Sequence, residues 1–332
     1  MISASSFPSL LQSFFIKRLV HQQQASPHTV AAYRDCFRLL LQFAKERLGK
    51  MPSQLRIEDL DAPFLTLFLD HLEDVRKNSA RTRNVRLGAV HSFFRYVASE
   101  EPAHALDCQR ILAVPNKRHE QRPIDFLNRE EINALLAAPS LSTWIGRRDR
   151  TLLLVAVQTG LRVSELIRLN CQDVVLGTGA HVRCLGKGRK QRCTPLRPET
   201  AKMLGAWLSE RRGLPGDPLF PSIRRGRLSR DAVERLITNY THLAARTCAS
   251  LKGKRVSPHV CRHSAAMDLL HHGVDRCVIA LWLGHESPET TQMYLHADMR
   301  LKEKALSRTD PLGAKPARYH PDDNLLAFLE SL

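Results

Sequence analysis

Apolar residues recur three to four positions apart along most of the chain, the spacing that places them on one face of a helix. Between residues 7 and 98 this pattern predicts four helices. The fourth of them is expected to turn Val85, Val90 and Phe93 towards a core. The N-terminal part of the chain is therefore predicted to be a small helical bundle.

The pattern changes after this bundle. Residues 113–123 are polar, basic and bracketed by prolines, a composition typical of linkers. A new helical pattern follows Leu127, where Asn128 and two glutamates predict a helix start. These changes predict four parts: a helical domain over residues 1–105, a linker over 106–124, a second domain over 125–310 and a tail over 311–332.

The second domain also contains three short runs with strand character, at residues 173–176, 180–185 and 191–196. A Gly-Thr-Gly turn joins the first two, and a glycine-containing loop at residues 186–190 joins the last two, as in tight hairpins. Helical patterns lie on both sides of these runs. The predicted fold class is therefore mainly α with a small antiparallel β-meander.

The charge balance narrows the class of partner. The chain has 50 Lys and Arg against 33 Asp and Glu, a net charge of +17, which favours a polyanion: nucleic acid first, an anionic membrane second. The longest apolar run, Leu152 to Val157, is far too short to span a bilayer. We therefore expect a nucleic-acid partner and no membrane association.

The eight cysteines show no framework spacing, which is typical of reduced thiols and of a cytoplasmic protein. Cys261 lies between His259 and His263, a grouping that invites comparison with a zinc site. It lacks a second pair of ligands at metal-binding spacing. We expect no metal site.

Basic residues dominate residues 76–95, a stretch that no acidic residue interrupts. Such a run is often only a solvated helix face. On a helix whose opposite face is apolar, it is better explained as an element that follows the phosphates of a nucleic acid. The basic residues expected to contact DNA in this stretch are Arg76, Lys77, Arg81, Arg83 and Arg86.

A stretch near the C-terminus gathers several side chains that can act on a phosphate. Ser257 and Pro258 predict a helix start, and His259 and Arg262 are three positions apart, so they share one face of that helix. The next helix is predicted over residues 275–283. Its expected buried side chains are Val278, Leu281 and Trp282.

Two further candidates follow that second helix. His285 lies in the turn after it, and a third predicted helix carries Tyr294, nine positions later. A histidine and a tyrosine taken singly are more often surface or packing residues than catalytic ones. Two helix boundaries with a turn between them would let both side chains converge on the face of His259 and Arg262.

This ordered set resembles the tyrosine site-specific recombinases, or phage integrase family, which includes the Xer-type resolvases. PHVCRHSAA resembles the family's His-x-x-Arg-His segment, LGHES its second histidine box and TTQMYLH its nucleophile box. Earlier in the chain, TGLRVSELIRL resembles the first arginine box and LGKGRKQRCTPL the segment of the hairpin lysine. Several motifs in order are far more specific than any one of them.

The resemblance implies an N-terminal SAM-like core-binding domain that clamps DNA and a C-terminal α+β catalytic domain. The implied catalytic residues are Arg162, Lys187, His259, Arg262, His285 and Tyr294, with Glu165 supporting Arg162. Without the resemblance, Arg162 would be a surface arginine and the Gly-Lys-Gly tip a solvated turn. Further DNA contacts are expected on the hairpin, from Arg189, Lys190 and Arg192.

The implied reaction needs neither a metal nor ATP. Tyr294 would attack a DNA phosphodiester and form a 3′-phosphotyrosyl link, while the arginines hold the phosphate oxygens. His259 would accept the phenolic proton or bond the phosphate, His285 would donate to a phosphate oxygen, and Lys187 would protonate the leaving oxygen. Because the link retains the bond energy, another strand's hydroxyl can reverse the attack.

Several roles remain open within this reading. The expected partner is an inverted-repeat site in double-stranded DNA, bound by a homotetramer on two duplexes, alone or with a related recombinase. The residues after Pro311 favour an enzyme of a mobile element, and a tail that docks on the neighbouring protomer. The alternatives are a Xer-like dimer resolvase, a type IB topoisomerase and a regulator without catalysis.

Overall fold

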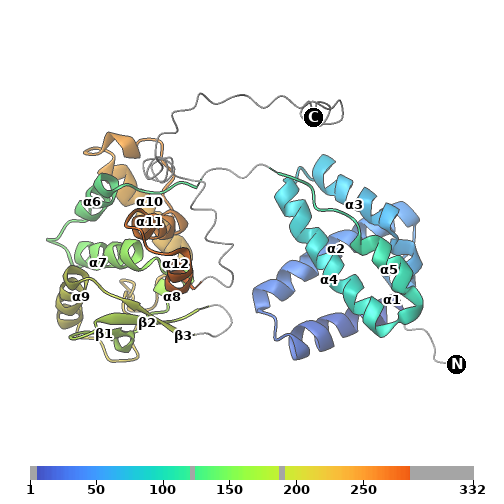
Figure 1. The fold of residues 1–332 in the computed structure, drawn as a ribbon, viewed down its shortest axis with the longest axis horizontal. Helices are drawn as coiled ribbons and strands as arrows, with labels where there is room; N and C mark the ends of the chain where they lie inside the picture. Colours follow the sequence, from blue (N-terminus) through green and yellow to red (C-terminus); the bar gives the residue numbers. More distant parts are fainter. Residues whose placement is uncertain (1–5, 120–123, 187–190, 285–332) are drawn as a thin grey trace, which may run out of the picture. The chain divides into compact units, whose positions relative to one another are not determined.

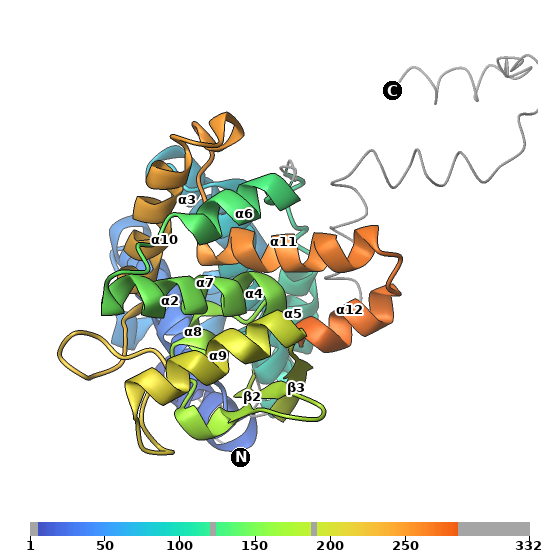
Figure 2. The same ribbon diagram turned by 90° about the vertical axis from the view of Figure 1, so that its left-hand side faces the viewer.

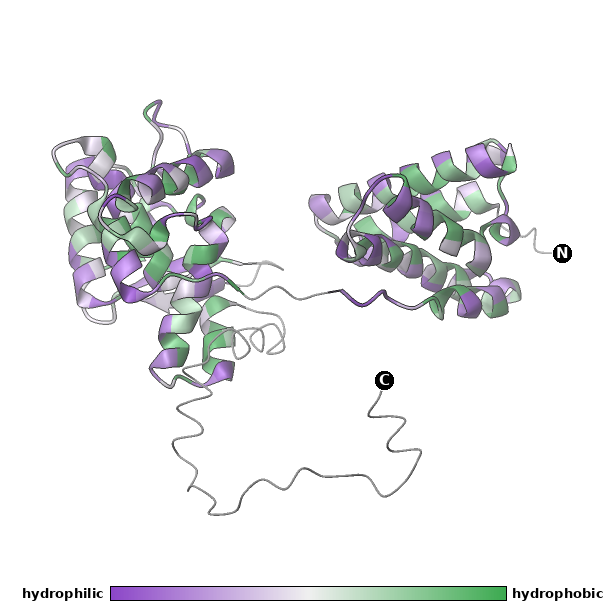
Figure 3. Ribbon diagram, turned by 90° about the horizontal axis from the view of Figure 1, so that it is seen from above, coloured by the Kyte–Doolittle hydropathy of each residue, from purple (hydrophilic) through white to green (hydrophobic). Residues whose placement is uncertain are grey.

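The computed structural model describes residues 6–119, 124–186 and 191–284. The chain divides into two compact units, Met1–Gln121 and Arg122–Leu332 (Figure 1). In both, apolar residues gather on the helix faces that meet inside the unit, and polar residues lie outside (Figure 3). Each unit therefore has a core of its own.

The first unit is helical throughout its described part. Its elements are α1 (Phe7–Ser13), the π-helix η1 (Phe14–Gln22), α2 (Pro27–Leu48), the 3₁₀ turns η2 (Pro52–Gln54) and η3 (Ile57–Leu60), α3 (Ala62–Asp74), α4 (Ala80–Glu100), η4 (Pro102–His104) and α5 (Ala105–Leu112). Ser26, Asp61 and Ser79 cap α2, α3 and α4, each accepting a hydrogen bond from a backbone N–H of the first turn.

Aromatic residues form the centre of this bundle. The rings of Phe14, Phe37 and Phe93 meet edge to face, with centroids 5.3 to 6.3 Å apart. Val90 is buried as predicted, but Val85 is 63% exposed. The prediction for Val85 was wrong because its side chain lies on the opposite side of α4 from the buried face, which begins earlier in the helix, at Arg83.

The helix α5 lies where the composition predicted a linker. Its Cys108 and Ile111 are buried in the core of the first unit, and α5 packs against α3 and α4. Residues 106–112 are therefore part of the bundle. The sequence did not predict α5 because the helix has only two buried positions and the residues that follow it are polar.

The second unit is built around one central, buried helix. Its elements are α6 (Arg129–Ala137), α7 (Trp144–Thr159), α8 (Val163–Leu166), η5 (Cys171–Asp173), β1 (Val174–Val175), β2 (His181–Leu185), β3 (Gln191–Pro195), α9 (Pro198–Arg211), α10 (Arg230–Ala244), η7 (Ala249–Leu251), α11 (Pro258–His271) and α12 (Arg276–Leu283). The helices α6, α9 and α11 pack against α7, as Figure 2 shows from one side.

The three predicted strands form one antiparallel sheet in the order β1-β2-β3. Val182 of β2 faces Thr194 of β3, and both are fully buried against the helices. The fold class predicted from the sequence, mainly α with a small antiparallel meander, is confirmed. Among the described residues no helix is both long and apolar enough to cross a membrane.

The short helix α12 turns a different face inward from the one predicted. Ile279, Ala280 and Leu283 are buried, whereas Val278 is 48% and Leu281 75% exposed. Trp282 is half-buried, and its indole N–H donates to the carbonyl oxygen of Thr159 at 3.1 Å. The prediction failed because seven of the eight residues are apolar or cysteine, so no polar face fixes the helix register.

Candidate active site

Arg162 is held in the turn between two helices of the second unit. Gly160 ends α7 in the left-handed region, at φ 64°, and Arg162 is the N-cap of α8. The backbone N–H of Arg162 donates to Oε2 of Glu165 at 2.7 Å, and its Nη1 donates to Oε1 at 2.9 Å. One carboxylate therefore fixes both the backbone and the side chain of Arg162.

The Glu165 side chain is only 4% exposed, so its charge needs partners. Burial raises the pKa of this carboxyl, but hydrogen bonds and charge from Arg192, and then from Arg162, outweigh burial and lower the pKa below its usual value. Glu165 is therefore ionised near neutral pH. An ionised carboxylate here holds Arg162 through charge-assisted hydrogen bonds.

Arg262 reaches the same place from α11. It is 5% exposed, and its Nη1 donates to the carbonyl oxygen of Gly160 at 2.6 Å while its Nη2 donates to that of Leu283 at 2.8 Å. Arg162 donates through Nη2 to the next carbonyl, that of Gly284, at 2.9 Å. The two guanidinium groups thus lie together at the C-terminal end of α12, where helix carbonyls favour positive charge.

His259 and His263 of α11 lie in different surroundings. His259 is exposed, one turn before Arg262 on the same helix. Burial, together with the charges of His259 and Arg262, lowers the pKa of His263 to about 4. His263 is therefore neutral near pH 7, and His259 is the more accessible of the two for a substrate.

Five predicted residues lie outside the described part of the chain: Lys187, Arg189, Lys190, His285 and Tyr294. Of the predicted catalytic set, the structure therefore places Arg162, His259 and Arg262, with Glu165 beside them. The two arginines converge from segments 100 residues apart (262 − 162). Both bond the carbonyls of the residues directly before His285.

Gly160 allows α11 and α12 to pack closely against the end of α7. A Cβ at Gly160 would lie 2.6 Å from Cδ2 of Leu283 and 3.2 Å from Cβ of Ala265. Gly160→Ala should therefore lower the free energy of unfolding by about 2 to 4 kcal/mol, through overpacking added to left-handed backbone strain. Urea denaturation of the two proteins measures this loss.

Gly273→Ala is the matched control for this change. Gly273 has φ +80° in the same unit, and nothing lies within 4 Å of a Cβ there. Only the backbone strain remains, so its loss should be about 1 kcal/mol. Equal losses for the two variants would show that the Gly160 contact with α12 is not tight.

Two residues predicted to contact DNA are instead engaged within the protein. The guanidinium of Arg192 bonds both oxygens of Glu165 at 2.9 and 2.8 Å, and its side chain is 13% exposed. Arg83 is 7% exposed, with Nη1 donating to the carbonyl of Pro115 at 3.1 Å and Nε 3.7 Å from Glu73. The sequence did not indicate these interactions, because the partners are distant along the chain.

The four other residues of the first unit that were predicted to contact DNA differ in exposure. Arg76, Lys77 and Arg81 are exposed, and Arg86 is half-buried. Lys77 has φ 53°, in the turn between α3 and α4. Arg76, Lys77 and Arg81 are accessible from solvent, and contact of these residues and Arg86 with DNA phosphates stays a prediction.

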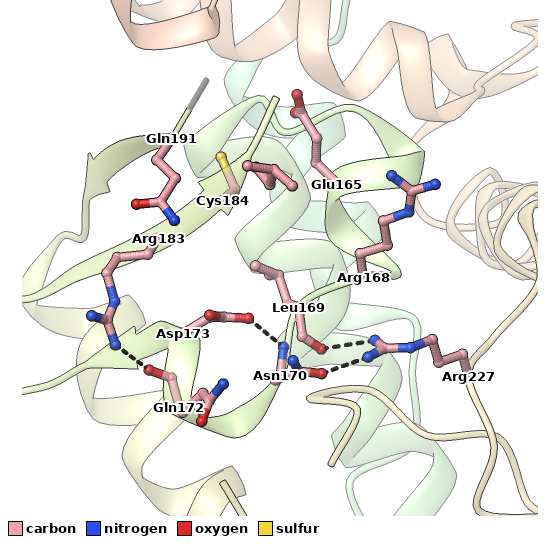
Figure 4. Close-up of a pocket in the computed structure, with 11 residues that line it drawn as sticks. Glu165, Arg168, Leu169, Asn170, Gln172, Asp173, Arg183, Cys184, Gln191 and Arg227 are labelled. Atoms are coloured by element: carbon pink, nitrogen blue, oxygen red, sulfur yellow. Dashed lines mark hydrogen bonds between the residues drawn. The ribbon is translucent and has the colours of Figure 1, made fainter. Parts of the chain in front are cut away.

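Three further arginines border a pocket of about 520 Å³ beside Glu165. Figure 4 shows Arg168, Arg183 and Arg227 around it, with the Glu165 carboxylate pointing away from Arg183 and Arg227. Nη2 of Arg227 donates to Oδ1 of Asn170 at 2.6 Å. The sequence signal was the basic run at residues 224–230, which matches no motif, so this positive rim was missed.

Family models and similar proteins all point to the same protein family. The model described as "Phage integrase family" matches residues 125–300, and the one described as "Phage integrase, N-terminal SAM-like domain" matches residues 13–101. A protein of Sinorhizobium fredii, "Putative integrase/recombinase y4rC", is 55% identical over 333 residues, covering 100% of both chains. "Tyrosine recombinase XerC" of Pelobacter propionicus is 32% identical and covers 91% of this chain and 95% of its own.

One similar solved structure extends the comparison to the fold. It is the XerH site-specific recombinase bound to a palindromic difH substrate, in a post-cleavage complex. Its TM-score is 0.69 at 22% identity, over 86% of this chain and 81% of that one. The arrangement of helices and hairpin described above is thus shared with a recombinase.

Proposed function

Because this chain belongs to the phage integrase family of tyrosine recombinases, we propose that it cuts DNA with Tyr294 as nucleophile and forms a 3′-phosphotyrosyl intermediate. As a member of the family it is an enzyme that breaks and rejoins DNA strands in site-specific recombination.

The paired arginines carry the proposal. Arg162 and Arg262 bond consecutive carbonyls at the end of α12, directly before His285 in the chain. A phosphate bound between two guanidinium groups would receive forked donors on its non-bridging oxygens, where negative charge grows during attack. His259, on the exposed side of α11, would bond the phosphate or accept the phenolic proton.

Three residues outside the described part complete the proposed site. Tyr294 would attack the phosphorus, His285 would donate a hydrogen bond to a non-bridging oxygen, and Lys187 would protonate the departing 5′ oxygen. In the first step the P–O5′ bond breaks as the P–O bond to tyrosine forms. Rejoining reverses these changes when a 5′ hydroxyl attacks the phosphotyrosine, so neither ATP nor a metal ion takes part.

A nicked suicide substrate tests this function directly. A duplex with a nick just past the cleavage position loses its short 5′-hydroxyl fragment, so the covalent intermediate cannot religate. We expect a denaturant-resistant protein–DNA adduct with the protein on the 3′ end, and the sequence of trapped junctions will define the site. A library of candidate DNA that yields no adduct under conditions of tight binding would contradict the proposal.

We propose that the enzyme serves a mobile genetic element and works in the cytoplasm, where its DNA lies. The family relative that is 55% identical along the whole chain bears the name of an integrase/recombinase. A Xer-like dimer resolvase is the second candidate, favoured by the XerC relative. Recombination between two plasmid-borne sites, assayed beside relaxation of a supercoiled plasmid without a site, distinguishes both roles from a type IB topoisomerase.

We also propose a homotetramer on two duplexes, because exchange of four strands requires four nucleophiles. A related recombinase could replace some of the protomers. The tail at residues 311–332 ends in NLLAFLESL, whose apolar residues are too few to form a stable helix alone. Docking on a neighbouring protomer would bury them.

Deletion of residues 324–332 should therefore weaken assembly more than cleavage. We expect single-site adduct formation within about 3-fold of wild type, but loss of two-site synapsis by about 10-fold or more, since each protomer contact is repeated around the tetramer. Native gels with one and two duplexes measure the two steps. Unchanged synapsis would show that the tail does not join protomers.

A further inference from the structure

Arg192 lies where the β-hairpin meets the paired arginines. Its Nη1 and Nη2 donate to Oε1 and Oε2 of Glu165 at 2.9 and 2.8 Å. Both side chains are shielded from water, at 13% and 4% exposure. Two parallel charge-assisted bonds in such a place form a strong pair of fixed geometry. Arg192 is therefore bound to a fixed partner inside the unit.

Arg162 and Arg192 together use all the hydrogen-bond acceptor sites of the Glu165 carboxylate. Oε1 accepts from Nη1 of Arg162 and from Nη1 of Arg192, and Oε2 accepts from the backbone N–H of Arg162 and from Nη2 of Arg192. A carboxylate offers about four lone-pair sites, so these four bonds use them all. The Arg162 guanidinium can consequently bond Glu165 through only one nitrogen.

This restriction leaves donors on Arg162 for a substrate. A guanidinium carries about five N–H hydrogens. The bonds of Arg162 to Glu165 and to the carbonyl of Gly284 use one hydrogen each. If Arg192 were absent, the Glu165 carboxylate would have two free lone pairs away from water, and the fork of Arg162 would rotate to pair with both oxygens.

Gly284 joins Arg192 to the end of α12. A Cβ on Gly284 would lie 2.8 Å from Nη1 of Arg192, so the guanidinium packs directly on the bare backbone of Gly284. Arg192 also lies on β3, the strand that follows the loop containing Lys187. One side chain thus contacts the residue before His285 and the carboxylate that holds Arg162.

We propose that Arg192 is a positioning residue: it saturates Glu165, so that Arg162 presents its free donors to the scissile phosphate, and it links the lysine hairpin to the arginine pair. This inference rests on the proposed function of Arg162 as a phosphate ligand. It assigns Arg192 to the ordering of the active site and removes it from the DNA-contacting surface.

Arg192→Gln should slow formation of the covalent adduct by about 10- to 100-fold, the size of loss that misplacement of a catalytic group causes. DNA affinity should stay within about 3-fold, because no phosphate contact is lost. Arg192→Lys keeps the positive charge beside the buried carboxylate and so protects the fold. One ammonium cannot cover both oxygens in this geometry, so this variant should also cleave about 10-fold more slowly.

A double-mutant cycle with Arg162→Lys separates positioning from general damage. If Arg192 acts through Arg162, the change at residue 192 should cost less than about 3-fold once Arg162 is already lysine. Arg147→Gln is the matched control, since Arg147 makes three bonds to Glu210 at 2.8 to 3.1 Å elsewhere in the unit. This control should cleave at the wild-type rate.

Each other outcome has a definite meaning. Wild-type protein that forms no adduct refutes the proposed function, whatever Arg192 does. If the wild-type protein forms the adduct, and Arg192→Gln and Arg192→Lys both form it at rates within about 3-fold of the wild-type rate, the positioning role is overturned. Fully multiplicative losses in the cycle also overturn it, as does a loss of DNA affinity in proportion to the loss of cleavage, which would return Arg192 to the DNA surface.

Discussion

Replacing Tyr294 with phenylalanine should abolish the covalent adduct and leave DNA binding near the wild-type level. The change removes one oxygen, the atom that would bond to phosphorus, and no other group in the proposed site can form the same phosphoester link. Neither the paired arginines nor the basic residues of α4 are altered, so the charge that attracts DNA is retained. Adduct formation on a nicked substrate and a gel-shift titration measure the two properties.

Tyr240→Phe provides the matched control for that variant. The hydroxyl of Tyr240 donates to Oδ2 of Asp149 at 3.0 Å, and burial, followed by the charge of Asp149, raises the pKa of Tyr240 to about 12. It is a structural phenol, and its loss should cost about 1 kcal/mol of stability without affecting cleavage. An adduct that persists in Tyr294→Phe, or vanishes equally in Tyr240→Phe, would remove Tyr294 from its role.

The parts of the fold that follow from local pattern could be predicted from the sequence. Asn128 and the acids after it begin α6 as expected, because a helix start needs only the residues of its first turn. The three strands follow from their glycine turns in the same way. Arg162 and Glu165 were also predictable as a pair, since they are three positions apart around a helix start.

The misassigned residues depended on partners far away in the chain. Arg192 and Arg83 have the same chemistry as DNA-contacting arginines, and only Glu165 and Pro115, brought near by the fold, show that they point inward. Burial within α12 depended on which face α11 covers. A count of charges predicts the class of partner, but not which of those charges meets it.

Arg262→Lys should slow cleavage by about 100-fold or more, the second largest effect expected, by the magnitude of one lost transition-state donor. Arg262 bonds the carbonyls of Gly160 and Leu283 through its two terminal nitrogens, which fixes the plane of its guanidinium. A lysine ammonium is a point charge with no fork. It could satisfy one of these carbonyls or approach the phosphate, but not hold the geometry that does both.

The loss of rate in Arg262→Lys should lie in the chemical step. Lysine keeps the positive charge, so DNA affinity should change by less than about 3-fold while the single-turnover rate falls. Arg197→Lys is the control: Arg197 pairs with Asp268 of α11 at 2.8 Å but is 48% exposed, where a lysine serves equally well. Near-normal cleavage by Arg262→Lys would mean that Arg262 only ties α7 to α12, and that a single arginine, Arg162, holds the phosphate.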